Sequence, residues 1–481
     1  MEKNDGSNNT NTKIAKLISQ CNNDQTYSLI MQDLYINGIF NSSPYINSFN
    51  CLPILQDKQL RNNFKKNINK IISYIKIIIN SPELDIYKVL SCIYGAFLGD
   101  AMGAFCEFEQ PNKNNSKMIF KTENTVIGGV PGQVTDDSEM ALSLAYAIMD
   151  SPLKEELSVD YIYFYYGAWF KTNPLDYGNT TETSLKPFDF ITFNPNKYNF
   201  GSIETSILQN NFNSLSNGFL MRKSTFIAWF YYRFYAEINQ TFSDIDNSKG
   251  LLELYKKIKH LSYADNKCTN PSEQANAVSA IYCLMALMAI KGLTANVIIH
   301  YISNLCRDSQ FRNNSNDEKF IAEIILYYIN LFNSKNFEFN KVFGDLNSQE
   351  CVFHKMGYYL HALKLTLYFL FQFDYIEPNQ PERKYREIMN QISDLGGDTD
   401  TNCCIVGAVL GPLIGMSNFG KEFYRMVELI PPNREIFSAS LALLFVIYLK
   451  KSNRDNDLIG NNKYFLQQIL TMLYGDIELD Y

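Results

Sequence analysis

Apolar residues recur at helical spacing along most of the chain from residue 88 onward. Met140, Leu144, Ala147 and Ile148 are one example, whereas the alternation typical of strands is rare. The pattern predicts helices over these ranges: 88–106, 138–150, 158–171, 220–238, 251–262, 273–291, 295–306, 317–332, 354–374, 383–392, 401–416, 420–428, 434–450 and 462–474. We therefore expect an all-α domain, whose longest irregular stretch is the proline-containing segment 186–216.

The first 85 residues differ from the rest of the chain. They are rich in Asn, with only short apolar pieces, and the first dozen residues are predicted to be disordered. An Ile-rich stretch from Leu60 to about Asn80 predicts one helix. We divide the chain into an Asn-rich, partly disordered N-terminal extension over residues 1–85 and a main domain over residues 86–475.

Two predicted helices carry glycine at every fourth position. The first has Gly95, Gly99 and Gly103, and the second has Gly407, Gly411 and Gly415, so each triplet would line one helix face. Glycine inside a helix costs about 1 kcal/mol relative to alanine, and close approach of two helix backbones is a sufficient reason for that cost. We expect the two glycine faces to meet each other or another central helix. The alternative is that one segment is a loop, since Pro412 lies in the second.

Two acid-and-hydroxyl clusters precede predicted helices. Thr135, Asp136 and Asp137 form the first, and Asp398, Asp400 and Thr401 form the second, after a pair of glycines. Taken singly, each is explained by helix capping. Taken together with Glu107, they bring five carboxylates to the ends of helices that we expect to meet, and such a group would repel itself unless a cation were bound. Hard oxygen ligands without histidine favour Mg²⁺, Mn²⁺ or Ca²⁺, and two ions are compatible with this many acids.

Bulk composition excludes several classes of protein. A net charge of −7 argues against nucleic acid as a partner, although it leaves room for a small phosphorylated ligand. The ten cysteines include no C-x-x-C pair, which makes a zinc site improbable and is typical of reduced thiols inside a cell. The polar N-terminus has no signal-peptide pattern, and the longest apolar run that we identify, Ala439–Leu449, is too short to cross a membrane. We expect a cytoplasmic protein with no membrane partner.

Five segments, in order, resemble the motifs of the ADP-ribosylglycohydrolase family, which includes the dinitrogenase-reductase-activating glycohydrolases and the ADP-ribosyl-acceptor hydrolases. They are residues 95–108 (GAFLGDAMGAFCEF), 132–142 (GQVTDDSEMAL), 176–181 (DYGNTT), 217–222 (NGFLMR) and 396–402 (GGDTDTN). The last matches the family pattern without change. The resemblance spans about residues 88–450, so residues 86–475 are expected to form the catalytic domain.

The resemblance implies an all-α, orthogonally packed fold with two Mg²⁺ ions, or Mn²⁺ in their place, in a central cleft. Carried over residue by residue, it implies the following metal ligands: Glu107, Thr135, Asp136, Asp137, Asp398, Asp400 and Thr401. It implies that the ADP-ribose pocket is shaped by Asn217, Gly218, Arg222 and Asn270. The chain departs from the pattern at three positions: Ser216, where glycine is common, Phe219, where a small residue is usual, and Asn270, where histidine is usual. These departures bear on how the substrate fits more than on how the metal binds.

The implied reaction is hydrolysis of the glycosidic bond between ADP-ribose and a modified protein arginine or serine. Catalysis would fall to Glu107, which by family analogy could also act as a mobile gate, and to Asp136 or Asp137 as the acid/base, between which the sequence does not choose. Two alternatives stay open. The chain could be a catalytically silent ADP-ribose binder or structural relative, or it could hydrolyse O-acetyl-ADP-ribose or a related small molecule.

Overall fold

The computed structural model describes residues 84–112, 125–127, 132–152, 156–171, 174–189, 193–197, 200–244, 247–376 and 381–420, together with isolated positions between 423 and 450. The helices predicted over 420–428, 434–450 and 462–474 lie wholly or largely outside the described residues, as do the N-terminal extension and its Ile-rich helix. The division of the chain at residue 85 therefore stays a prediction.

All regular elements of the described residues are helices, apart from one isolated bridge between Ser216 and Tyr358. The longer helices are α5 (Leu84–Gly103), α6 (Asp136–Asp150), α7 (Val159–Phe170), α9 (Gly201–Asn211), α11 (Lys223–Arg233), α13 (Ser248–Asn266), α14 (Glu273–Lys291), α15 (Ala295–Arg307), α17 (Asn316–Phe332), α19 (Tyr359–Gln372), α20 (Pro381–Ser393) and α21 (Thr399–Ile414). The shorter ones are α8 (Asn179–Leu185), α10 (Gly218–Met221), α12 (Tyr235–Thr241), α16 (Ser309–Arg312) and α18 (Phe339–Phe343), with single 3₁₀ turns between some of them. The all-α prediction is confirmed.

Three sequence predictions need correction. The segment 186–216 is not irregular throughout, because it contains α9. That helix buries only Ile207 and Asn211, so it has no apolar stripe from which it could be predicted. The helix predicted over 220–238 is divided into α10, α11 and α12, and the one predicted over 354–374 begins only at Tyr359, after a 3₁₀ turn.

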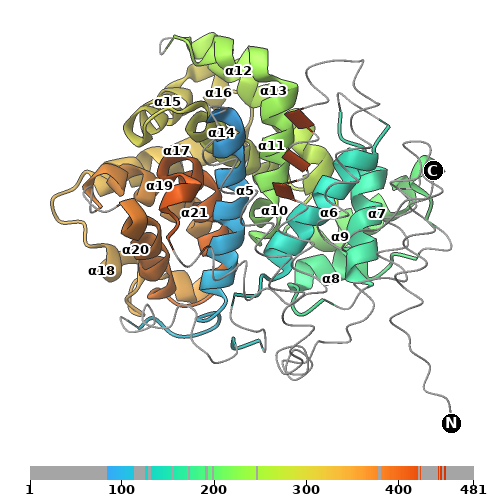
Figure 1. Cartoon of the computed structure of the whole chain (residues 1–481), viewed down its shortest axis with the longest axis horizontal. Helices are drawn as coiled ribbons and strands as arrows, with labels where there is room; N and C mark the ends of the chain where they lie inside the picture. The colour runs from blue at the N-terminus through green and yellow to red at the C-terminus, as the bar shows by residue number, and fades with distance from the viewer. Residues whose placement is uncertain are drawn as a thin grey trace, which may run out of the picture.

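Helices α5 and α21 form the centre of the described domain, as Figure 1 shows, with α6 to α9 on one side and α17 to α20 on the other. The two glycine faces meet, as the spacing predicted. A Cβ atom on Gly99 would collide with the carbonyl group of Cys403, and one on Gly103 would collide with that of Thr399. Helix α21 continues through Pro412 to Ile414, whereas Gly415 lies just beyond its end with a φ of 80°.

Helix α14 is a buried core helix. It is long and apolar enough to pass for a membrane span, which corrects our expectation that Ala439–Leu449 is the longest apolar run. However, 89% of its most apolar window is buried inside the protein. Ser272 caps its first turn and Gly292, with a φ of 97°, ends it. The eight cysteines among the described residues are free and buried, as is expected of core thiols.

Candidate active site

The contact between α5 and α21 places two groups of acids together. Glu107 follows the C-terminal end of α5, and Asp398 and Asp400 lie at the N-terminal end of α21. The two chain segments are joined by backbone hydrogen bonds, since the amide of Phe108 donates to the Gly397 carbonyl (2.7 Å) and the amide of Gly397 donates to the Glu109 carbonyl (2.9 Å). The left-handed backbone that this turn requires, with a φ of 78° at Gly397, explains why glycine precedes Asp398.

Asp100 attaches the third acidic segment to α5. Its carboxylate accepts hydrogen bonds from the amide and the hydroxyl of Thr135 (both 3.0 Å) and from the amide (3.1 Å) and hydroxyl (2.5 Å) of Ser138. These contacts hold the first turn of α6, and with it Asp136 and Asp137, against the middle of the domain. Asp100 lies within the first recognised motif, but its role was missed because a single acid in a glycine-rich helix gives no separate signal.

Helix capping does not account for the acidic clusters. Thr135 and Asp398 occupy the N-cap positions of α6 and α21, yet neither side chain makes a capping hydrogen bond. Genuine caps occur elsewhere in the chain, where Asn247 and Ser272 each accept a bond from the amide three residues later. The side chains of the two clusters contact one another instead, so hydrogen-bonded capping is not their role.

Two groups of acids lie close enough to hold a metal ion. Asp100, Asp137 and Asp400 form one, and Glu107, Asp398 and Asp400 form the other, with one oxygen from each residue within 4.8 Å of the others in its group. Asp400 belongs to both. Asp136 belongs to neither, although it is buried next to them. We call the set of Asp100, Glu107, Asp136, Asp137, Asp398 and Asp400 the carboxylate cluster.

Two hydroxyl groups complete the cluster. The Thr135 hydroxyl lies 3.1 Å from Asp137 Oδ2 and 3.3 Å from Asp400 Oδ2, and the Thr401 hydroxyl lies 3.3 Å from Asp137 Oδ2. All seven residues that the family resemblance implied as ligands are therefore gathered around one point of the fold. Each had been selected from the sequence, but only the packing of α5, α6 and α21 brings them together.

The carboxylate cluster is electrostatically unbalanced. Burial, reinforced by the charges of Asp176 and Asp398, raises the pKa of Glu107 to about 10. Burial raises the pKa of Asp100 to about 7, in spite of the hydrogen bonds from Ser138 and Thr135. The pKa values of Asp136, Asp137 and Asp400 also rise well above their ordinary range, chiefly through burial and then through neighbouring acids.

The residues present fit a divalent cation. Asp137 Oδ1 and Glu107 Oε2 are buried without a hydrogen-bond partner. Within the described part of the chain, no lysine or arginine is paired with the carboxylate cluster. Buried acids without partners are costly, and an ion held by their oxygens would remove both the repulsion and the loss of hydrogen bonds. The donors are carboxylate and hydroxyl oxygens, which are the ligands of hard cations.

Asn217 and Asn270 lie beside the cluster. The Asn217 side chain donates a 2.6 Å hydrogen bond to Asp398 Oδ2, which joins the fourth motif to the fifth. The Asn270 side chain donates to the hydroxyl of Ser216 (3.0 Å), and its own Oδ1 is buried without a partner. A Cβ added at Gly218 would lie in ordinary contact with the hydroxyls of Ser216 (3.9 Å) and Thr181 (4.0 Å). This side of the cluster is therefore polar.

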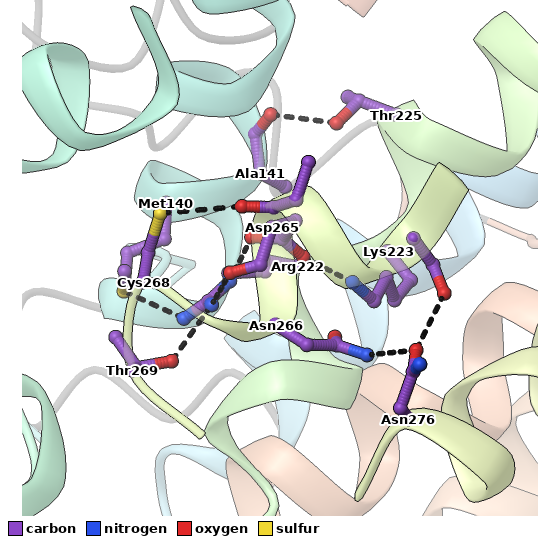
Figure 2. Close-up of polar contacts among 12 residues, drawn as sticks. Met140, Ala141, Arg222, Lys223, Thr225, Asp265, Asn266, Cys268, Thr269 and Asn276 are labelled. Atoms are coloured by element: carbon purple, nitrogen blue, oxygen red, sulfur yellow. Dashed lines mark hydrogen bonds and ion pairs between the residues drawn. The ribbon is translucent and has the colours of Figure 1, made fainter. Parts of the chain in front are cut away.

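Arg222 has a different environment from the one that a pocket residue would have. Figure 2 shows its guanidinium group enclosed between α6 and the end of α13. It donates to Asp265 Oδ1 (2.9 Å) and to the Thr269 hydroxyl (2.8 Å), and it lies over the Tyr166 ring. Its exposed fraction is 0%, so the structure leaves no surface of this side chain free for direct contact with a ligand.

Two further residues bear on the sequence predictions. Phe219 does not narrow the site, since its ring is fully buried and packs against Tyr359 at 5.9 Å. Asp176 of the third motif was not selected, yet its charge raises the pKa values of Glu107 and Asp136 and it therefore belongs beside the cluster. Its motif was the only available signal, because it lies between helices α7 and α8 without an acidic neighbour in sequence.

Fold and site together define a class: a helical protein whose central helix pair, with α6, gathers buried acids able to hold metal ions. The chain belongs to the ADP-ribosylglycohydrolase family, because the model of the family described as ADP-ribosylglycohydrolase matches residues 82–448. The family assignment also makes the chain a hydrolase by class, and it confirms the resemblance on which the sequence predictions were based.

Two sequence relatives agree with this assignment. A protein of Acanthamoeba polyphaga mimivirus, provisionally named an ADP-ribosyl glycohydrolase, is 27% identical over 339 residues, which cover 68% of this chain and 86% of the relative. The ADP-ribosyl-dinitrogen reductase glycohydrolase of Rhodospirillum rubrum is 31% identical over 106 residues, or 21% of this chain and 34% of that protein. A solved structure titled ADP-ribosylglycohydrolase-related protein complex has 17% identity and a TM-score of 0.48, and covers 76% of this chain and 99% of its own.

Proposed function

We propose that the chain is a magnesium-dependent hydrolase that cleaves the glycosidic bond between ADP-ribose and a modified protein arginine or serine. One observation carries the proposal: carboxylate oxygens from three distant segments, buried except for the half-buried Asp398, converge in two overlapping groups that share Asp400. No basic side chain of the described residues balances them. Family membership supplies the substrate class, and the oxygen-only donor set supports Mg²⁺, with Mn²⁺ as the alternative.

The carboxylate cluster has places for two ions that would share Asp400. One would be held by Asp100, Asp137 and Asp400 with the Thr135 hydroxyl, and the other by Glu107, Asp398 and Asp400. Bound divalent ions of this kind orient sugar hydroxyls and a water molecule and stabilise developing negative charge. The Asn217 side chain donates a hydrogen bond to Asp398, which helps to fix the direction of that carboxylate.

We assign the acid/base role to Asp136 rather than to Asp137. The Asp137 carboxylate already accepts hydrogen bonds from the hydroxyls of Thr135 and Thr401 and belongs to an ion-holding group. Asp136 belongs to no such group, so its carboxyl is not already committed to holding an ion. It would protonate the leaving atom of the acceptor as the bond to the anomeric carbon breaks, and would regain its proton from the attacking water.

The ADP-ribose moiety is proposed to lie against Gly218, which has no side chain, with Asn217 and Asn270 beside it. Arg222 would act on this region indirectly. It joins α11 to the end of α13 through Asp265 and Thr269, and the same chain segment continues to Asn270. Arg222 therefore positions two walls of the proposed pocket without touching its contents.

Turnover of defined substrates tests the proposal. Purified protein is incubated with an ADP-ribosyl-arginine peptide, an ADP-ribosyl-serine peptide and O-acetyl-ADP-ribose, each with Mg²⁺ or with excess EDTA, and free ADP-ribose is measured. We expect release from at least one peptide in Mg²⁺, loss of release in EDTA, and loss in the variant Asp398→Asn. Asp345→Asn, which changes an exposed loop aspartate, is the matched control and keeps full activity.

Other outcomes would reject specific parts of the proposal. Binding of ADP-ribose without release from any conjugate would indicate the silent binder. Release from O-acetyl-ADP-ribose alone would move the reaction to a small-molecule substrate. Undiminished release by Asp398→Asn would show that the carboxylate cluster is not the site.

A further inference from the structure

Phe108 has an unusual backbone conformation at an important position. It follows Glu107 directly, and among the described residues it is the one non-glycine residue with a positive φ, 62°. For a bulky residue this backbone conformation is strained. Burial does not offset the cost, because the Phe108 side chain is 50% exposed. The fold therefore maintains a strained backbone, with a half-exposed aromatic side chain, at the residue that follows Glu107 of the carboxylate cluster.

The hydrogen bonds with Gly397 explain how the conformation is held. The Phe108 amide and the Glu109 carbonyl are both paired with Gly397, at 2.7 and 2.9 Å. Gly396 is pressed against the same segment, since a Cβ there would collide with the Glu109 carbonyl. Residues 107–109 are thus fixed to the loop that carries Asp398, and Phe108 cannot relax without moving a residue of the cluster.

Met356 lies at the same place from a third part of the chain. A Cβ on Gly397 would be 3.2 Å from Met356 Cγ, and the Met356 side chain is 46% exposed. Two large apolar side chains, from segments nearly 250 positions apart in sequence, are therefore half exposed around Gly397, which precedes Asp398. We call Phe108 and Met356 the apolar lip.

We propose that the apolar lip packs against the acceptor peptide and makes the chain prefer peptide conjugates of ADP-ribose to small ones. This inference rests on the proposed function. If the carboxylate cluster holds the ribose whose bond is broken, the groups next to Glu107 and Asp398 adjoin the leaving group. The adenine lies farther along the substrate, beyond the diphosphate and a second ribose. A phenyl ring and a thioether accept varied apolar surface, as an acceptor of variable sequence requires.

Three substitutions at Phe108 separate the ring from the backbone strain. Phe108→Ala removes the ring and keeps the strain, Phe108→Gly removes both, and Phe108→Leu keeps apolar surface. In kcat/KM for an ADP-ribosylated peptide we expect about a tenfold loss in the Ala and Gly variants and a smaller loss in the Leu variant. For O-acetyl-ADP-ribose all three should stay within about twofold of wild type. Phe108→Gly should be more stable than Phe108→Ala, so its loss of peptide activity would not come from unfolding.

The control is Phe320→Ala, which removes a ring of similar exposure (41%) from α17 and should change neither substrate. Equal losses on both substrates would overturn the proposal for the apolar lip, because the ring would then serve the carboxylate cluster itself. Wild-type activity on the peptide in both Phe108→Ala and Phe108→Gly would also overturn it. If wild type releases nothing from any conjugate, the proposed function fails separately. Fluorescence anisotropy then decides: the lip requires an ADP-ribosyl peptide to bind more tightly than ADP-ribose, and requires Phe108→Ala to abolish that difference.

Discussion

The protein buries two groups of charges in opposite ways. In the network of Arg222, Lys223 and Asp265, two cations meet one carboxylate, and every contact is made within the protein. Burial alone would raise the pKa of Asp265, but the charges of Arg222 and Lys223 bring it below its ordinary value. In the carboxylate cluster, burial and like charge act in the same direction, and together they raise the pKa values of Glu107 and Asp400.

The difference separates a structural charge from a functional one. A buried ion pair that satisfies itself needs no other partner, and its residues hold elements together. A buried group of like charges lacks a countercharge from the chain itself. An external cation is the simplest way to supply it. Sequence motifs contained residues of both kinds, and Arg222 was assigned to the pocket because the motif could not distinguish them.

The largest expected effect comes from removing the acid that both ion-holding groups share. Asp400→Asn should lower kcat/KM for an ADP-ribosylated peptide by on the order of a thousandfold, because both proposed ions lose a ligand. In EDTA the same variant should be at least as stable as wild type, since a buried repulsion is removed. Steady-state kinetics and thermal unfolding measure the two effects. Wild-type activity in this variant would show that the carboxylate cluster is not a functional site.

Breaking the self-satisfied network should mainly cost stability. Arg222→Leu leaves Asp265 with Lys223 as its one cation and the Tyr166 hydroxyl as its other donor, and it removes the bond to Thr269. We therefore expect the free energy of unfolding to fall by about 3–5 kcal/mol. Urea denaturation followed by circular dichroism provides the measurement. The stabilisation by added Mg²⁺ should be the same size as in wild type. A loss below about 1 kcal/mol, or a loss of Mg²⁺ stabilisation, would show that the two charge groups are not separate.

Metal ions should stabilise the wild-type protein, and more so at higher pH. A concentration of 100 times Kd adds about 2.7 kcal/mol to the free energy of unfolding. The raised pKa values of Asp100, about 7, and Glu107, about 10, mean that the metal-free fold binds more protons than the unfolded chain, whose carboxyls titrate near pH 4. The contribution of these two acids to the stability of the metal-free fold is complete below about pH 4. It is lost as the pH rises through about 7 for Asp100 and then about 10 for Glu107. Denaturation midpoints at pH 5 and 8, with Mg²⁺ or EDTA, test this. A metal-free protein that gains stability from pH 5 to 8 would contradict it.

The smallest effect concerns the helix contact that brings the acids together. Gly99→Ala introduces a methyl group against the Cys403 carbonyl and should cost about 1–3 kcal/mol, with a loss of activity as α5 and α21 separate. Gly201→Ala is the matched control, because a Cβ at Gly201 has open space around it, and it should be neutral or slightly stabilising. Equal stability of the two variants would mean that α5 and α21 have room to adjust.

Much of this protein was determined locally and is readable from the sequence. Helical periodicity predicted most of the described helices, because a helix that buries one face must carry apolar residues at matching intervals. The glycine triplets predicted the approach of α5 to α21, because only the missing side chain lets two backbones come so close. The same argument predicted that the acids at the ends of those helices lie close together, because each acid is only a few residues from a glycine of the contact.

The tertiary structure alone decided what each polar residue does. Asp100 and Arg222 are both charged, both buried and both part of recognised motifs, yet one anchors the first turn of α6 beside the acids and the other is enclosed by Asp265 and Thr269. The fate of a charge depends on which distant groups surround it, and local patterns carry no record of those neighbours. The strained backbone of Phe108 could not be predicted from the sequence for the same reason. Its conformation is imposed by hydrogen bonds with Gly397, almost 290 residues later in the chain.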